Sequence, residues 1–199
     1  MLLNPENFEQ ALQLLGELLT ARRTAHYDLV VCGGTALLAT KLVSRSTHDV
    51  DVLARKNPDG EVFRAHPLPA ELLQAAGEVA RELGLESGWL NSSASFHFPD
   101  FDALPNSFWV DLDIRDFGDC LRVRFVTRPG QILLKLYAAL NRSEPRDIED
   151  LLALNPDATE TEAGLGWLLD SIPGLTHRDR LPELLTALGH GKLTERFQR

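Results

Sequence analysis

LVVCGGTALLATKLVSRSTHDVDVL, which runs from Leu29 to Leu53, carries the strongest structural pattern in this chain. Its first four residues, 29–32, form an apolar run that predicts a buried strand, and a Gly-Gly-Thr turn follows. Ala36–Val43 is predicted to form a short helix after this turn. Val50–Leu53 predicts the next strand, with acidic residues alternating among its apolar ones.

Two carboxylates, Asp49 and Asp51, occur at strand spacing at the end of this stretch. Because side chains alternate between the faces of a strand, both are expected on one face. Neighbouring carboxylates repel each other unless a cation lies between them. Hard oxygen ligands suit Mg²⁺, which usually arrives with substrate phosphates, so the pair predicts a metal site. The competing interpretation is an exposed strand face that ends at a turn.

The residues before this pair predict a phosphate site. Gly33 and Gly34 leave room for a phosphate to approach backbone N–H groups at a helix start, where the helix dipole favours an anion. Thr35 could cap that helix or donate its hydroxyl to a phosphate. Ser46 and Thr47 could also reach phosphate oxygens, or could serve only as strand-entry residues. The alternative for the glycines is a tight turn that binds no ligand.

The order strand, Gly-Gly-Thr, helix, Asp-x-Asp resembles the signature of the nucleotidyltransferase superfamily, which has a polymerase-beta-like fold. A second block, Ile132–Leu136 followed by Arg146–Leu151, resembles the AbiEii-type branch, including MenT-like toxins of bacterial toxin–antitoxin pairs. Together the blocks span roughly residues 29–151. The resemblance implies an α/β (α+β) fold, with a mixed sheet and flanking helices over 1–127. A helical C-terminal domain over 128–199 would complete the active site.

The resemblance also assigns roles to single residues. Asp49 and Asp51 would hold magnesium, and Lys135 would neutralise charge that builds on the triphosphate. Asp147 would position Lys135 or act as a base toward the acceptor hydroxyl, with Asp150 as a structural partner. The alternatives are a lysine that snorkels at a helix edge and an Asp147 that stabilises a helix N-terminus.

Alternating residues farther along predict strands over 93–98, 108–114 and 121–126. The second of these carries another acidic pair, Asp111 and Asp113. Many nucleotidyltransferases take a third metal carboxylate from a later strand, and the resemblance offers Asp111, or else Asp113, for this role. The competing interpretation is a solvent-facing strand edge.

Apolar residues at helical spacing predict the helices. A stripe from Phe8 to Leu19 predicts an N-terminal helix that packs on the sheet, and Pro69–Leu83 predicts another that ends at Gly84. Glu61–Pro69 contains two prolines and is expected to be an exposed loop. After Thr127 the chain is mostly helical, with helices expected over Gly130–Leu140, Pro145–Leu154, Thr159–Ser171 and Arg178–Gly189.

The chain has 199 residues, a formal net charge of −9 and two cysteines, Cys32 and Cys120. Its length fits one domain with an appendage or two small domains. The acidic balance argues against a protein that coats nucleic acid, although a local basic groove could still bind RNA. We expect buried free thiols, no signal peptide and no membrane span, and hence a cytoplasmic protein.

These patterns predict an enzyme that transfers NMP from an NTP to an acceptor and releases pyrophosphate, with Mg²⁺ as cofactor. The resemblance implies the 3′ end of tRNA as acceptor, a pyrimidine NTP such as CTP as donor, and a toxin with a cognate antitoxin as partner. Two alternatives stay open. One is the same enzyme class acting on a small molecule or a protein side chain, and the other is a non-catalytic binding module. The sequence does not indicate the oligomeric state.

Overall fold

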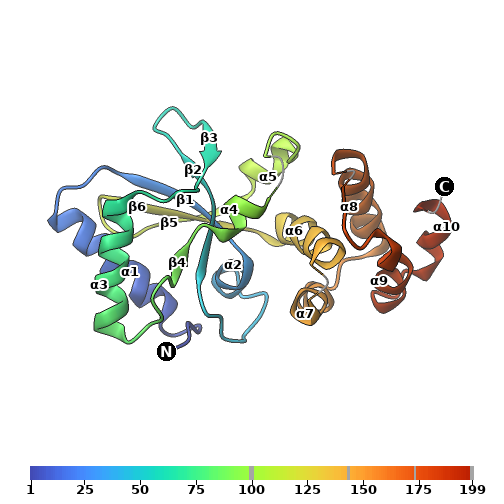
Figure 1. Ribbon diagram of the computed structural model, residues 1–199, viewed down its shortest axis with the longest axis horizontal. Coiled ribbons are helices and arrows are strands. Elements are labelled where there is room, and N and C mark those ends of the chain that lie inside the picture. The colour runs from blue at the N-terminus through green and yellow to red at the C-terminus, as the bar shows by residue number, and fades with distance from the viewer. Residues whose placement is uncertain (99–100, 143, 173, 198–199) are drawn as a thin grey trace. The chain divides into compact units, whose positions relative to one another are not determined.

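Two compact units make up the structure, Met1–Thr127 and Arg128–Arg199. The predicted α/β (α+β) class is confirmed, because the first unit holds a mixed sheet with flanking helices and the second is helical (Figure 1). The computed structural model describes the following residues: 1–98, 101–142, 144–172 and 174–197.

Over the described residues of the N-terminal unit the sheet has six strands: β1 (Tyr27–Cys32), β2 (Val50–Lys56), β3 (Val62–Arg64), β4 (Leu90–Asn91), β5 (Leu112–Asp116) and β6 (Leu121–Val126). Their order is β3-β2-β1-β6-β5, and β4 pairs with β2. β1 is antiparallel to β2 and parallel to β6, so the sheet is mixed at its centre. The strands predicted over 29–32, 50–53 and 121–126 are confirmed.

Helices α1 (Phe8–Ala21) and α3 (Ala70–Leu83) contribute their apolar stripes to one buried cluster with the sheet (Figure 1). Leu29, Val31 and Phe125 are fully buried in this cluster. Because side chains alternate between the two faces of a strand, the residues next to these three in β1 and β6 point to the opposite face of the sheet. Both helices were predicted, and α3 ends as expected at a glycine, which adopts the left-handed conformation with φ of +63°.

The stretch predicted as a strand over 93–98 is instead a helix, α4 (Ser93–His97), so this prediction is wrong. The side chain of Arg64 donates hydrogen bonds of 2.8 Å to the backbone carbonyls of Ser95 and Phe98. These bonds satisfy carbonyl groups that a short helix leaves without partners at its C-terminal end. A contact with a residue about thirty positions earlier in the chain therefore overrides the local alternation.

The strand predicted over 108–114 is wrong in its first half. Helix α5 (Asn106–Val110) occupies that part, and β5 begins only at Leu112. Pro105 stands directly before α5 with φ of −63°. Proline has no N–H to give to a sheet and its fixed φ suits a helix start, which explains why the alternating residues after it fold as a helix.

Two further boundaries differ from the expectation. β3 occupies part of the predicted loop over 61–69 because it pairs with β2 across a turn, and Leu68 in the same stretch is buried. Helix α2 (Gly33–Ala39) begins three residues before the predicted start at Ala36, and it ends before the predicted end at Val43. Lys41 has φ of +59°, a conformation that does not continue a helix.

The C-terminal unit is helical: α6 (Arg128–Asn141), α7 (Pro145–Leu154), α8 (Ala158–Ser171), η1 (Arg178–Arg180), α9 (Leu181–Ala187), η2 (Gly191–Leu193) and α10 (Thr194–Phe197). α7 has both of its predicted ends. α6 packs against α7 and α8, and Gly164 permits the second contact, because a Cβ there would lie 2.7 Å from Leu136. Over the described residues of both units, no helix combines the length and apolarity that crossing a membrane would require.

Candidate functional site

Asp51 lies in β2 on the sheet face opposite to the main apolar cluster. The register pairs Val52 with Val31, and both belong to that cluster. The next pair in the register joins Asp51 to Cys32, so the side chain of Asp51 points to the other face of the sheet. Asp49 precedes β2 by one residue, and both aspartates are partly exposed.

Asn91 is a site residue that the sequence analysis missed. It pairs with Asp51 in the parallel register between β4 and β2. Its side-chain Nδ2 donates a 3.0 Å hydrogen bond to Oδ2 of Asp49, and its Oδ1 accepts a 2.8 Å bond from the backbone N–H of Ser93. Asn91 thus joins the Asp49 carboxylate to the first residue of α4. An asparagine in a two-residue strand carries no motif, so only the strand pairing could have found it.

The two glycines allow close approaches at the N-terminal turn of α2. A Cβ on Gly33 would lie 2.9 Å from Oδ2 of Asp51, and Gly33 has φ of +67°. A Cβ on Gly34 would lie 2.4 Å from Oγ1 of Thr47. Side chains at either position would therefore displace the Asp51 carboxylate or the Thr47 hydroxyl. The glycines bring a carboxylate against the turn where the sequence predicted a phosphate.

The three hydroxyl residues of the predicted phosphate site have different surroundings. Thr35 is fully buried within α2 and donates a 2.6 Å hydrogen bond to the backbone carbonyl of Asp49. It does not cap α2, whose N-cap residue is Cys32. Thr47 is also buried, and its backbone N–H and C=O both bond to Leu3 at 2.8 Å. Ser46 is partly exposed, and phosphate binding by the three hydroxyls stays a prediction.

Asp111 and Asp113 do not form the predicted alternating pair. Asp111 follows α5 outside β5, and its carboxylate accepts a 2.9 Å hydrogen bond from the hydroxyl of Thr127. Asp113 lies opposite Phe125 of the apolar cluster and pairs with Arg115 at 2.7 Å. Asp113 therefore points to the sheet face opposite to Asp51. A metal-binding role for Asp111 stays a prediction.

A buried ion cluster joins α6 and α7 in the C-terminal unit. Nζ of Lys135 lies 2.8 Å from Asp147 and 2.7 Å from Asp150, and Arg142 lies 3.1 Å from Asp147. Lys135 is 7% exposed and both aspartates are more deeply buried, so the lysine does not snorkel to the surface. The buried carboxylates of Asp147 and Asp150 thus have the buried Lys135 as a shared cation, and the partly exposed Arg142 also pairs with Asp147.

Asp147 lies in the first turn of α7, where its charge is favourable at the helix N-terminus, as the alternative holds. The N-cap residue of α7 is Glu144, and no side-chain capping bond forms there. The Asp147 carboxylate instead accepts hydrogen bonds from Lys135 and Arg142. Asp147 thus fixes the lysine ammonium within the unit. Arg146, the preceding residue, is exposed.

One pKa shift in the same unit belongs to a structural contact. Arg128 pairs with Glu160 and holds the pKa of that carboxyl below its ordinary value of 4.5, helped by a bond from the backbone of Asp157. Asp157 and Glu160 form a capping box at the start of α8. This pair therefore anchors the first turn of α8 and makes it sensitive to acid.

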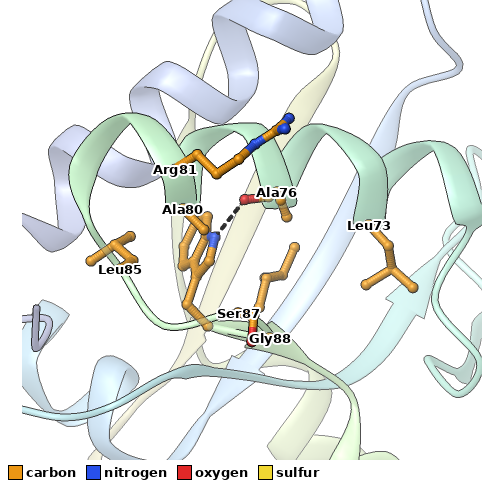
Figure 2. Close-up of a pocket in the computed structure, with 10 residues that line it drawn as sticks. Leu73, Ala76, Ala80, Arg81, Leu85, Ser87 and Gly88 are labelled. Carbon is orange, nitrogen blue, oxygen red and sulfur yellow. Dashed lines mark hydrogen bonds between the residues drawn. The ribbon is translucent and has the colours of Figure 1, made fainter.

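A hollow of about 320 Å³ lies along α3, but it is not the candidate site (Figure 2). Leu73, Ala76 and Ala80 of α3 line it, together with the segment that leads to β4, and the indole N–H of Trp89 donates to the carbonyl of Ala76 at 2.8 Å. Arg81 supplies a positive charge at its edge. Neither Asp49 nor Asp51 is among the described residues that line this hollow.

Within the described ranges, His, Cys, Asp and Glu side chains form no cluster of three or more that could hold a metal ion. The acidic pair before and within β2 would need other oxygen donors to complete a coordination shell. Water and substrate phosphates are the usual source of such donors for Mg²⁺.

Residues 6–76 match a family described as a nucleotidyltransferase of unknown function, DUF6036. The matched segment runs from the start of α1 into α3, and it includes both glycines and both aspartates of the site. No curated protein and no solved structure matches the chain. The match supports a nucleotidyltransferase-type domain in the N-terminal unit, while the AbiEii-type, MenT-like branch stays a prediction.

Proposed function

We propose that this chain is an enzyme that transfers a nucleotidyl group from an NTP to an acceptor hydroxyl. The observation that carries the proposal is the Asp51 carboxylate, which lies against the N-terminal turn of α2 beside Gly33. A phosphate bound to the N–H groups of that turn would meet the negative charges of Asp49 and Asp51. A divalent cation between the groups would replace this repulsion with attraction.

The available donors fit Mg²⁺. Asp49 and Asp51 offer two carboxylates, and Asn91 fixes the first of them through its amide N–H. Mg²⁺ commonly binds one or two carboxylates and takes its remaining ligands from water and substrate phosphates. When bound, it would neutralise charge on the phosphates of the NTP.

In the proposed reaction the acceptor oxygen forms a bond to the α-phosphorus of the NTP. The bond from this phosphorus to the bridging oxygen breaks, pyrophosphate leaves with the electron pair, and the proton of the acceptor hydroxyl passes to solvent water. Lys135 would stabilise charge on the departing pyrophosphate, as the resemblance implies. Asp147 already accepts hydrogen bonds from Lys135 and Arg142, so its contacts support positioning of the lysine better than proton abstraction.

The identity of the acceptor rests on the resemblance of the C-terminal blocks. On that basis we propose the 3′ end of tRNA as acceptor and a pyrimidine NTP such as CTP as donor. The protein would then act in the cytoplasm as a toxin whose cognate antitoxin is its partner. Blocking the tRNA 3′ end would prevent aminoacylation.

The test incubates the protein with Mg²⁺, total tRNA and each of the four α-labelled NTPs in turn. Asp51→Asn removes one carboxylate charge and keeps the size of the side chain. Asp59→Asn is the matched control, because Asp59 is exposed in the turn after β2. We expect label to enter RNA from one NTP with the wild-type protein and with Asp59→Asn, and to be absent with Asp51→Asn.

Transfer that persists in Asp51→Asn would contradict the metal assignment. If label enters a small molecule or a protein instead of RNA, the enzyme class stands and the tRNA acceptor is wrong. If no acceptor is labelled and titration calorimetry detects no NTP binding, the chain is a non-catalytic module.

A further inference from the structure

An exposed aromatic pair lies beside the candidate site. Phe96 of α4 is 63% exposed, and its ring contacts the ring of His66 edge-on, with centroids 5.0 Å apart and planes at 63°. A single exposed ring is ordinary on a protein surface, so what distinguishes Phe96 is its contact with His66 and the way its backbone is held.

The backbone beneath Phe96 is held firmly. The buried hydroxyl of Ser95 accepts hydrogen bonds from the backbone N–H groups of Ala65 (2.9 Å) and His66 (3.3 Å). The guanidinium of Arg64 donates to the carbonyl of Ser95, as described above. These hydrogen bonds join the segment that carries His66 to the helix that carries Phe96. The backbone on both sides of the aromatic pair is therefore ordered.

The same frame leads directly to the acidic pair. Asn91 donates to the Asp49 carboxylate and accepts from Ser93, the first residue of α4. His66 bonds through Nδ1 to the hydroxyl of Ser92 at 3.1 Å. Phe96 follows Ser93 by three residues, about 5 Å along a helix axis. α4 also packs against β2, the strand that carries Asp51 (Figure 1). The aromatic pair is therefore connected to the proposed metal site through Asn91, Ser92 and α4.

The charge of the surrounding residues suits a nucleic acid component. Arg64 stacks over the ring of Phe101 with 4.7 Å between the guanidinium carbon and the ring centroid. Lys56 of the neighbouring strand β2 pairs with Val62, which lies on the same face of β3 as Arg64. Two positive side chains thus lie on this face in a chain whose net charge is −9. Aromatic rings interleaved with basic side chains are how proteins bind unpaired bases and their phosphates.

We infer that Phe96 and His66 form a stacking surface for an unpaired nucleobase of the substrate. This inference rests on the proposed function for the choice of ligand, since the pair is joined to the proposed metal site through Asn91. The base could belong to the NTP or to the end of a nucleic acid acceptor, and the chemistry of stacking is shared by both.

The test measures the fluorescence of nucleobase analogues, which is quenched when the base stacks on an aromatic ring. One arm uses pyrrolocytidine triphosphate, an analogue of the proposed pyrimidine donor, and the other uses a single-stranded oligonucleotide with 2-aminopurine at its 3′ end. Loss of one stacked base corresponds to about 5- to 150-fold weaker binding. We expect this loss in Phe96→Ala for one of the two ligands, and near wild-type binding in Phe96→Tyr.

The matched control is Phe63→Ala. Phe63 is 39% exposed and neighbours Arg64 in β3, so it points to the opposite face of the strand. Thermal melting of each variant verifies the fold. Weakening in the oligonucleotide arm alone assigns the surface to the acceptor, and weakening in the triphosphate arm alone assigns it to the donor.

Equal affinity of wild type and Phe96→Ala for both ligands would overturn the inference, as would an absence of quenching in the wild-type protein. The two proposals remain separable, because quenching does not require transfer. Label transfer that is unaffected by Phe96→Ala, together with unchanged quenching, leaves the enzyme standing and removes the stacking surface. If quenching depends on Phe96 but the protein transfers no label, the stacking surface stands and the proposed enzyme activity is wrong.

Discussion

Replacing Lys135 by methionine should destabilise the C-terminal unit by about 3–5 kcal/mol. The substitution keeps a long apolar side chain but leaves Asp147 and Asp150 buried without their shared cation. Arg142 remains near Asp147, yet its side chain is 55% exposed and compensates only in part. A loss of this size is a large share of the 5–15 kcal/mol that stabilises a typical domain. Lost turnover in this variant would therefore not separate a catalytic lysine from a structural one.

A triple variant removes the ambiguity. Lys135→Met combined with Asp147→Asn and Asp150→Asn deletes all three buried charges and changes the side-chain volumes little. Because no buried charge remains unpaired, and Arg142 is exposed to solvent, we expect the triple variant to regain most of the stability lost in the single variant. Turnover should stay absent if the ammonium acts on the triphosphate, and should return if the cluster is only structural.

Urea unfolding gives the stability of each variant from its midpoint and slope. Hydrogen exchange of peptides from α6 and α7 shows whether the loss is located at the cluster. A free energy change below about 1 kcal/mol in Lys135→Met would refute the reasoning from buried charge, since that is the range of exposed ion pairs. A triple variant less stable than the single variant would refute it equally.

Gly16→Ala should destabilise the fold by about 3 kcal/mol or more, because its Cβ would lie 1.6 Å from the backbone carbonyl oxygen of Phe117. In helix α3, a Cβ on Gly77 would have no atom within 4 Å, so Gly77→Ala should instead stabilise the fold by about 0.5–1 kcal/mol. A thermal melt in which Gly16→Ala is the more stable of the two variants would contradict the close-packing argument. The lowered pKa of Glu160 predicts stability that is complete above its ordinary value of 4.5 and is lost as pH falls through the lower folded-state pKa. Glu160→Gln, which cannot titrate against Arg128, should flatten the dependence of unfolding free energy on pH below 4.5, and an unchanged curve would exclude this pair as an acid-sensitive contact.

The parts of the fold that sequence predicted are those whose signal is local. The apolar run at 29–32, the pair Asp49 and Asp51, and the helix over 145–154 each depend on periodicity and turn residues within a few positions. Side-chain alternation alone was enough to place the acidic pair at the start of β2. The same reasoning correctly found the helix that carries Lys135.

The failures share a dependence on distant contacts. Helix α4 was predicted as a strand because Arg64, which binds its terminal carbonyls, lies about thirty residues away. Asn91 became a site residue only through the parallel pairing of β4 with β2. The direction of Asp113 followed from the register with β6, after α5 had taken the first half of the predicted strand. Local alternation does not specify any of these arrangements.

The glycine pair and the aspartate pair are best understood as one arrangement. Gly33 is needed because the Asp51 carboxylate occupies the space where its Cβ would stand. A carboxylate against a helix start already satisfies the positive end of the dipole, so a phosphate arriving there would compete with it. Two unit charges 4 Å apart repel by about 1 kcal/mol in water and about 4 kcal/mol near a protein surface. A divalent cation between carboxylate and phosphate reverses the sign of that term, and a nucleotide that arrives with its cation would therefore bind where a bare phosphate would be repelled.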